Sequence, residues 1–265
     1  MTKLWKWSGA GNLFVVIDGR DGGSVSDIQR LCREHGTDGL MVLRESAFGR
    51  DFAMEFYNPD GSSGMMCGNG GRCIAAFADM LGLKPSDGKV FRFDAPDGVH
   101  TAEILQRPAD PAASEWTVRL GMIDVAGITE YPDGLFLNTG TRHFVKFVPD
   151  VETIDIDAEA KPIRFDPRFA PEGTNVNFVQ LGDTIKIRTF EKGVEGETAA
   201  CGTGITASAI ACRYKGITPA SESADGRIVY RLQAREATLS VDFIQKKEDA
   251  FSDVFLTGPA RILAE

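Results

Sequence analysis

The sequence predicts an α+β fold of two pseudo-symmetric halves, each a rolled, mostly antiparallel sheet around a central helix. First, four local patterns recur in the same order at offsets of about 131 to 137 residues, which indicates a duplicated domain. Second, strand-like stretches joined by short turns outnumber helical ones, which favours antiparallel pairing over a doubly wound parallel sheet. Third, each half has one helix-like stretch that is apolar all round, and a curved sheet would bury it on every side.

The first half is expected to start with a strand at residues 12–18 and a helix at 26–35, which Ser26 caps and Gly36 ends. Residues 51–57 alternate apolar side chains, as in a strand with one buried face. Its other expected elements are strands at 40–43, 90–93, 98–105 and 116–120, a turn at 58–61, a helix at 68–81 and a hairpin tip at 108–114.

The second half repeats this plan. Its expected elements are strands at 135–137, 143–148, 177–181, 184–190, 228–233, 238–243 and 252–256, a short helix at 155–160 and a helix at 203–214. The loop at 121–133, which contains proline and glycine, marks the boundary. We therefore expect an N-terminal half at 1–122, which a returning segment at about 257–265 rejoins, and a C-terminal half at 123–256.

Composition and charge narrow the possible partners and the compartment. The 265 residues carry a net charge of −9, which argues against nucleic acid or an anionic membrane as the main partner. No apolar run is long enough to span a bilayer, and no signal-peptide core follows the N-terminus. Five cysteines, an odd number, indicate thiols in a reducing cytoplasm. No zinc-ligand spacing is present, and Cys32, Cys73 and Cys212 fall on apolar helix faces, as buried hydrophobic residues do.

The two remaining cysteines, Cys67 and Cys201, stand in matched surroundings, each followed by glycines and a helix-like stretch. A thiol at a helix start ionises more readily than its ordinary pKa of about 8.5 allows, and nearby amide groups can hold an anion. Two such thiols on opposite faces of a carbon acid would invert a stereocentre, one removing a proton and the other delivering one. Glycine-rich turns also merely begin helices, but a matched pair favours the catalytic interpretation. A dinucleotide site is not indicated, because the G-x-G-x-x-G pattern is missing.

Two titratable residues are candidate helpers of these thiols. Glu191 ends a predicted strand ten residues before Cys201, and His143 begins another. Either could accept a thiol proton or hold the thiols in the required charge state. An isolated histidine is more often a structural residue, so the pattern alone leaves the role of His143 open.

Five motifs together resemble the diaminopimelate epimerase family. They are GAGNLFVVID at 9–18, NPDGS at 58–62, MCGNGGR at 66–72, EGTNVNF at 172–178 and ETAACGTG at 197–204. They follow that family's order and span nearly the whole chain. Asn69 also separates the sequence from the related proline racemases, which typically have histidine at that place.

The resemblance implies a pyridoxal-independent, metal-free isomerase that converts LL- to meso-diaminopimelate, for lysine and peptidoglycan synthesis. It implies no cofactor, a cytoplasmic location, closure of the halves around substrate and a homodimer. Cys67 and Cys201 would be the acid/base pair, with His143 and Glu191 beside them. The residues implied to hold the reacting α-carboxylate are Gly68, Asn69, Gly202 and Thr203, and those implied to bind the rest of the substrate are Asn12, Asn58, Asn175, Glu191 and Lys192.

The departures from the family pattern lie at the distal end of the substrate. Leu13 replaces an aspartate, Thr141 and Arg142 replace an Asn-Pro pair, and Lys192 replaces an arginine. A lysine keeps the charge but loses the bidentate fork for a carboxylate, and we hypothesise that Arg142 compensates. These changes motivate an alternative, an amino-acid racemase of the same scaffold with another side-chain specificity. A non-catalytic binding protein is a third interpretation, against which the two intact cysteine motifs argue.

Overall fold

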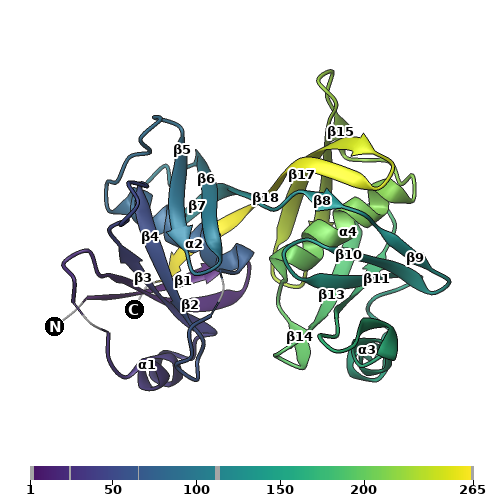
Figure 1. The fold of residues 1–265 in the computed structure, drawn as a ribbon, viewed down its shortest axis with the longest axis horizontal. Helices are drawn as coiled ribbons and strands as arrows, with labels where there is room; N and C mark the ends of the chain where they lie inside the picture. The colour runs from purple at the N-terminus through teal and green to yellow at the C-terminus, as the bar shows by residue number, and fades with distance from the viewer. Residues whose placement is uncertain (1–2, 24, 65, 111–113, 264–265) are drawn as a thin grey trace. The chain divides into compact units, whose positions relative to one another are not determined.

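The computed structural model describes residues 3–23, 25–64, 66–110 and 114–263. The chain forms two compact units, one of residues 1–121 with 258–265 and the other of residues 122–257 (Figure 1). The predicted fold class is confirmed, because each unit is a rolled sheet, antiparallel in most of its pairings, that surrounds one buried helix.

The first unit is a closed sheet. Its strands are β1 (Leu4–Gly9), β2 (Asn12–Asp18), β3 (Gly39–Arg44), β4 (Phe52–Tyr57), β5 (Val90–Ala95), β6 (Gly98–Gln106), β7 (Glu115–Gly121) and the C-terminal part of β18 (Ala250–Leu263). Pairing runs in chain order from β1 to β7, and β18 joins β7 to β1. Only the β2–β3 and β4–β5 pairs of this unit are parallel within the described residues.

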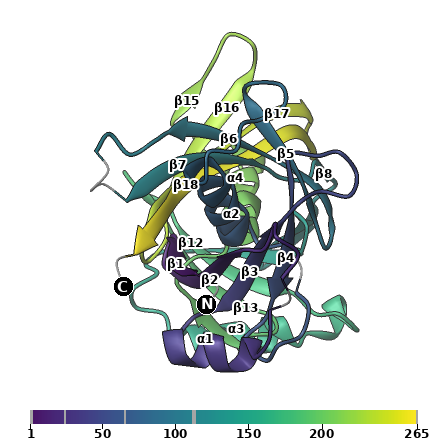
Figure 2. The ribbon, with the colours of Figure 1, turned by 90° about the vertical axis from the view of Figure 1, so that its left-hand side faces the viewer.

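Two helices lie on opposite sides of this sheet. Helix α2 (Gly68–Met80) packs on β1, β2, β3, β6 and β7, and its residues 68–79 are all buried (Figure 2). Helix α1 (Ile28–His35) packs on β2 and β3, where Cys32 joins a small apolar cluster with Val15 and Leu40. The predicted Ser26 cap is wrong, because Asp27 holds the N-cap position in a left-handed conformation without a side-chain cap.

The second unit repeats the same plan with its own strands. They are β8 (Val125–Ala126), β9 (Thr129–Tyr131), β10 (Gly134–Asn138), β11 (Arg142–Val148), β12 (Asn175–Gln180), β13 (Ile185–Glu191), β14 (Gly196–Thr198), β15 (Ser221–Glu222), β16 (Arg227–Gln233), β17 (Thr238–Lys247) and the first part of β18. The parallel pairs, β11–β12 and β13–β16, hold the same places as those of the first unit. The duplication seen in the sequence is therefore a repeat of strand order and direction.

Helix α4 (Gly202–Tyr214) is the buried helix of the second unit and packs on β10 to β13 and on β16 and β17. Helix α3 (Ile156–Arg164) covers β12 and β13 from outside. The predicted short helix at 155–160 is extended by one turn, through Pro162, because Ile163 joins Ala160 in an apolar cluster beneath it. Phe178 and Phe190 belong to the same cluster.

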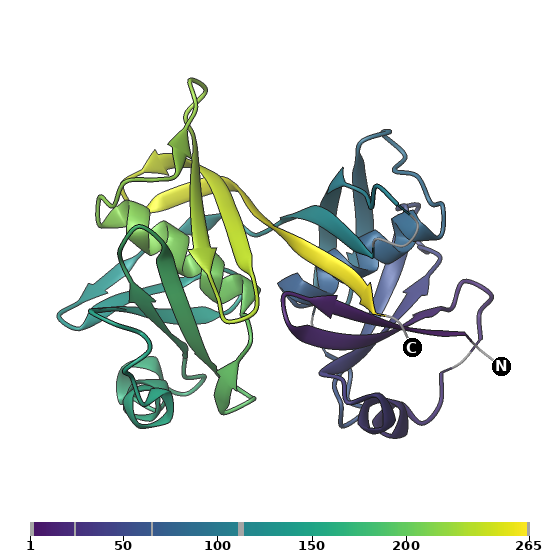
Figure 3. The ribbon, with the colours of Figure 1, turned by 180° about the vertical axis from the view of Figure 1, so that it is seen from behind.

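The last strand, β18, is one continuous element of 14 residues (Figure 3). The sequence predicts a strand at 252–256 and, apart from it, a returning segment at about 257–265. Residues 240–257 of the β17–β18 ladder belong to the second unit, and Gly258 to Leu263 pair with β7 and β1 in the first. The strand β1 and the short strands β8, β9, β14 and β15 were not predicted. Part of the expected hairpin tip at 108–114 lies outside the described residues. In the described chain no helix combines the length and the apolar character needed to cross a membrane.

Candidate active site

The first thiol, Cys67, is the N-cap residue of α2 and is half-buried. Its Sγ accepts a hydrogen bond of 3.2 Å from the backbone N–H of Gly70. Gly70 makes room for this arrangement, since a Cβ there would lie 3.3 Å from the sulfur. The sulfur therefore sits at the positive end of the helix, where amide N–H groups and the helix dipole favour negative charge on the thiol and on a bound anion.

Asn69 and Asn12, both predicted site residues, are in direct contact. The Asn69 Nδ2 donates to Asn12 Oδ1 at 2.5 Å, and Asn12 Nδ2 donates to Asp38 Oδ2 at 3.3 Å. Asp38 also accepts from the backbone N–H of Leu13. Gly9 lies against this helix start, because a Cβ there would come within 2.6 Å of the Asn69 carbonyl oxygen. The N-terminal hairpin and the start of α2 thus form one polar surface beside Cys67.

Arg72 is a fully buried cation at the start of α2. Its guanidinium donates to Asn69 Oδ1 at 2.7 Å, to the Gly68 carbonyl at 3.1 Å and to the Pro259 carbonyl of β18 at 3.3 Å. Burial lowers the pKa of Arg72 to about 10, which still leaves the group protonated at neutral pH. Arg72 therefore ties the cysteine-bearing helix start to the returning C-terminal strand and turns the Asn69 amide toward Asn12.

Asn58 lies in the turn after β4 and bonds within that turn. Its backbone N–H donates to the Ser62 carbonyl at 2.9 Å and its Nδ2 donates to Ser62 Oγ at 3.0 Å. Asp60 in turn accepts from the backbone N–H and the hydroxyl of Ser62. The structure thus brings Asn12 and Asn69 together, whereas the contacts of Asn58 are those of a turn residue.

The second thiol, Cys201, is the N-cap residue of α4 and only 8% exposed. Burial raises the pKa of the Cys201 thiol well above its usual value, and the nearby Glu191 carboxylate raises it further. The expectation of a readily ionised thiol is therefore wrong for Cys201, because desolvation and a neighbouring negative charge outweigh the helix end. At neutral pH Cys201 is a protonated thiol.

His143, on β11, is completely buried. Its Nδ1 lies 3.0 Å from Asn177 Nδ2, and its Nε2 lies 2.9 Å from Thr203 Oγ1. Burial lowers the pKa of His143 to about 3. The imidazole is thus neutral at physiological pH, and of its two possible helper roles it is suited to hydrogen bonding rather than to accepting a thiol proton.

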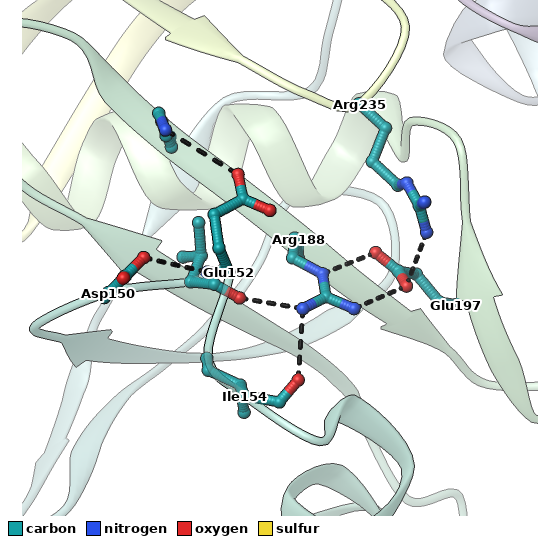
Figure 4. Close-up of polar contacts among 8 residues, drawn as sticks. Asp150, Glu152, Ile154, Arg188, Glu197 and Arg235 are labelled. Atoms are coloured by element: carbon teal, nitrogen blue, oxygen red, sulfur yellow. Dashed lines mark hydrogen bonds and ion pairs between the residues drawn. The ribbon is translucent and has the colours of Figure 1, made fainter.

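Glu191 ends β13, and its Oε1 accepts a hydrogen bond of 2.5 Å from Thr198 Oγ1 on β14. The β13–β14 hairpin is held by a bidentate pair, in which Arg188 donates to both carboxylate oxygens of Glu197 at 2.7 and 2.8 Å (Figure 4). Arg188 also donates to the carbonyls of residues 151 and 154, and Arg235 donates to Glu197 at 2.9 Å (Figure 4). This network fixes the strand that presents Thr198 to Glu191.

Asn175 connects the residues at which the chain departs from the family pattern. Its Nδ2 donates to the Arg142 carbonyl at 2.8 Å and to Thr141 Oγ1 at 3.2 Å, and its Oδ1 accepts from the Lys192 backbone N–H at 2.8 Å. The Lys192 residue is exposed. The Arg142 guanidinium forms an ion pair of 2.8 Å with Glu172, so the hypothesis that it binds a distal carboxylate requires this pair to be exchanged for substrate.

Gly202 and Thr203 begin helix α4 beside Cys201. The Thr203 carbonyl accepts a hydrogen bond of 2.9 Å from Thr139 Oγ1, which anchors the helix start to the end of β10. Gly204 is in tight contact, since a Cβ there would lie 2.3 Å from Asn177 Oδ1. All of these residues come from one unit, and together they surround a single thiol.

Several residues of these two environments were not among the predicted site residues: Asp38, Arg72, Thr141, Asn177 and Thr198. A signal existed for Asn177, which follows Asn175 at the period of a strand in an otherwise buried run. The five cysteines are all present as thiols. Burial raises the pKa of Cys73 and of Cys212 to about 12, as expected for inert core residues. Among the described residues, no three His, Cys, Asp or Glu side chains are grouped as metal ligands would be.

Each unit is a sheet around a buried helix that begins at a cysteine. This is the fold of a class of proteins that includes solved epimerases and racemases. Solved structures have this fold over at least 99% of the chain, although at only 12 to 14% identity. They include a phenazine biosynthesis protein of Bacillus anthracis, with a TM-score of 0.73 and 97% of that protein covered. A probable proline racemase of Agrobacterium radiobacter has a TM-score of 0.65, with 91% covered.

The family model of diaminopimelate epimerase matches residues 4–110 and 135–259. The diaminopimelate epimerase of Aquifex aeolicus is 39% identical, over 97% of this chain and 94% of the relative. That of Flavobacterium psychrophilum is 36% identical, over 99% and 98% respectively. The chain therefore belongs to the diaminopimelate epimerase family, and it is an isomerase.

Proposed function

We propose that this protein interconverts LL- and meso-diaminopimelate without a cofactor, with Cys67 and Cys201 as the acid/base pair. The observation that carries the proposal is that each of the two repeated units places a thiol at the start of a largely buried helix. In such a reaction a thiolate removes the α-proton from one face, and the opposite thiol delivers its own proton to the other face. One S–H bond forms while the other breaks, so the enzyme ends with the two charge states exchanged.

The different surroundings of the two thiols support different resting states. Cys201 is buried beside Glu191 and holds its proton, which suits the acid of the first turnover. Cys67 accepts an amide hydrogen bond at a helix start, beside the buried cation Arg72, which suits the base. The two lobes would be residues 1–122 with 257–265, and residues 123–256, and both thiols must reach one α-carbon.

The remaining site residues have roles in binding under this proposal. The amide groups of Gly68, Asn69, Gly202 and Thr203 would hold the α-carboxylate and stabilise the charge that develops on it. The residues that would bind the distal amino-acid end are Asn12, Asn58, Asn175 and Lys192. Glu191 and His143 would set the protonation and hydrogen bonding of Cys201. The product would serve lysine and peptidoglycan synthesis in the cytoplasm, and we infer a homodimer from the family resemblance alone.

The second candidate function is racemisation of another amino acid on the same scaffold. Its support is the distal end, where Lys192 is exposed and Arg142 is paired with Glu172. Neither residue offers the fixed bidentate fork that best recognises a carboxylate. A substrate with a different side chain would fit such an end equally well.

Hydrogen exchange in deuterated water separates these functions. The protein is incubated with LL- and meso-diaminopimelate and with a panel of single L-amino acids, and α-hydrogen exchange is followed by NMR. Exchange with diaminopimelate alone supports the proposal. Exchange with another amino acid but not with diaminopimelate supports the racemase, and exchange with no substrate contradicts both.

Cysteine variants test the two-base mechanism. We expect Cys67→Ala and Cys201→Ala each to abolish epimerisation, because each removes one of the two proton carriers. Cys212→Ala is the matched control, since Cys212 lies on the same helix as Cys201 but is buried away from the helix start. Substantial activity in either of the first two variants would exclude the mechanism.

A further inference from the structure

The donor and the acceptor of each hydrogen bond around Cys201 can be assigned in turn, starting from Asn177. The Thr189 hydroxyl donates to Asn177 Oδ1 at 3.0 Å, and the Phe144 carbonyl accepts from Asn177 Nδ2 at 3.2 Å. A carbonyl can only accept, so this contact identifies the amide nitrogen of Asn177. The same nitrogen lies 3.0 Å from His143 Nδ1 and must donate to it.

The donor and acceptor nitrogens of the His143 ring can be assigned in the same way. Because His143 Nδ1 accepts a hydrogen bond and the imidazole is neutral, the ring proton is on Nε2. This Nε2–H lies 2.9 Å from Thr203 Oγ1 and 2.9 Å from Thr141 Oγ1. The single Nε2–H proton of His143 is therefore shared between the two threonine hydroxyls.

The hydroxyl group of Thr141 also donates its proton toward Thr203. Its Oγ1 accepts from Asn175 Nδ2 at 3.2 Å and lies 3.2 Å from Thr203 Oγ1. With its oxygen occupied by Asn175 and His143, the Thr141 hydroxyl proton is directed to Thr203 Oγ1. Thr203 then accepts from the Thr141 hydroxyl and from the shared proton of His143, and its own proton is left for another acceptor.

That acceptor is the sulfur of Cys201. Thr203 Oγ1 lies 3.4 Å from Cys201 Sγ, within the range of a hydrogen bond to sulfur. The proton of the thiol is directed to Glu191, whose carboxylate is the strongest acceptor beside it. The sulfur lone pairs are therefore available to Thr203, beside the backbone N–H of Gly204 that also donates to the sulfur.

We propose that the Thr203 hydroxyl is a catalytic hydrogen-bond donor to Cys201, and that His143 and Thr141 are positioning residues that orient it. When Cys201 gives its proton to the substrate carbanion, the S–H bond breaks, its electron pair stays on sulfur, and the intact Thr203 O–H bond stabilises the new thiolate. This role rests on the proposed function. It is distinct from α-carboxylate binding, which uses the backbone N–H of Thr203.

The titratable groups described around Cys201 are Glu191 from β13 and the neutral His143 from β11. On β12 the facing side chains are the neutral amides of Asn175 and Asn177. The first turn of α4 has no acidic residue. A change in the Thr203 hydroxyl alone should therefore be visible in the ionisation of the thiol.

The test measures the reactivity of Cys201 in the substrate-free protein. Wild type, Thr203→Val and Thr203→Ser are alkylated with iodoacetamide across a range of pH, and modification of each cysteine is quantified by peptide mass spectrometry. Valine keeps the shape and the backbone N–H but removes the hydroxyl, whereas serine keeps the hydroxyl. We expect Thr203→Val to move the pH midpoint of Cys201 alkylation upward by about one unit, a roughly tenfold slower reaction below the midpoint.

Three comparisons keep the result specific. Thr203→Ser should stay within about 0.3 unit of wild type, and Cys67, in the other unit, should react alike in all three proteins. Thr141→Val should cause a smaller upward shift. If valine disturbs folding, as judged by circular dichroism, Thr203→Ala against Thr203→Ser makes the same comparison. An unchanged Cys201 profile in the valine or alanine variant, or a serine profile that matches it, would overturn the proposal.

Turnover gives an independent readout. Under the proposed reaction, Thr203→Val should lower kcat about tenfold while KM is retained, because the backbone N–H that binds the carboxylate remains. The alkylation experiment needs no substrate. A protein that fails to act on diaminopimelate but shows the Cys201 shift would contradict the proposed function and leave the hydrogen bond from Thr203 to Cys201 intact.

Discussion

The neutral, buried His143 makes the stability of this protein fall in mild acid. Burial lowers the pKa of His143 from 6.5 to about 3, so between these pH values the unfolded chain binds a proton that the folded chain excludes. Stability is therefore complete above about pH 6.5 and decreases as pH falls toward 3. At about pH 5 the loss is roughly 2 kcal/mol, obtained from 1.36 kcal/mol per pH unit. Since the side chain is 0% exposed, solvent screening does not reduce this value.

The assay is urea unfolding at about pH 7.5 and pH 5, for wild type and His143→Gln. Glutamine retains an amide donor near the position of Nε2 but cannot titrate, and both other histidines, His35 and His100, remain in both proteins. Wild type should lose about 2 kcal/mol more than the variant between the two pH values. Equal losses would refute the conclusion that His143 is held neutral, and with it the direction of hydrogen bonding assigned to its ring.

Two further predictions concern packing and the hairpin beside Glu191. Gly204→Ala should lower the free energy of unfolding by about 1–3 kcal/mol, because its Cβ would overlap Asn177 Oδ1 at 2.3 Å; thermal denaturation measures this, and an unchanged Tm contradicts it. Glu197→Gln should cost about 1–2 kcal/mol because it breaks the bidentate pair with Arg188, whose side chain is only 17% exposed. Arg235→Gln removes the 58% exposed side chain of the same network and should cost less than about 0.5 kcal/mol. Equal losses of unfolding free energy for Glu197→Gln and Arg235→Gln in urea would contradict the conclusion that burial sets the strength of these ion pairs.

The main elements were readable from sequence because their signals are local. Asn12 to Asp18 forms a strand as predicted, and the helices after both cysteines begin and end within a residue or so of their expected limits. The Ser26 cap failed because several polar residues precede α1 and only the tertiary path decides which one ends the loop. The last strand, β18, was divided because Gly258 and Pro259 interrupt its pattern, whereas pairing with β7 carries the chain straight through them.

The site residues likewise divide into those with a local sequence signal and those whose roles depend on tertiary contacts. The two thiols were found because a cysteine followed by glycines at a helix start is a local pattern that occurs twice. Asp38 and Arg72 were missed because their roles arise from contacts with Asn12 and with the carbonyl of Pro259, which lies 187 positions away in the chain. The expectation of an acidic thiol failed at Cys201 because burial and the approach of Glu191 are properties of the folded unit.

The amino-acid sequence was enough to predict that the chain is duplicated, that each half wraps a sheet around an apolar helix, and that Cys67 and Cys201 begin those helices. These follow from periodicity and local motifs, which depend on neighbouring residues. The folded unit was needed to establish that His143 is neutral, that Cys201 holds its proton and that the Thr203 hydroxyl faces the Cys201 sulfur. Charge state and hydrogen-bond direction depend on desolvation and on partners from β11, β12 and β13, which only folding brings together.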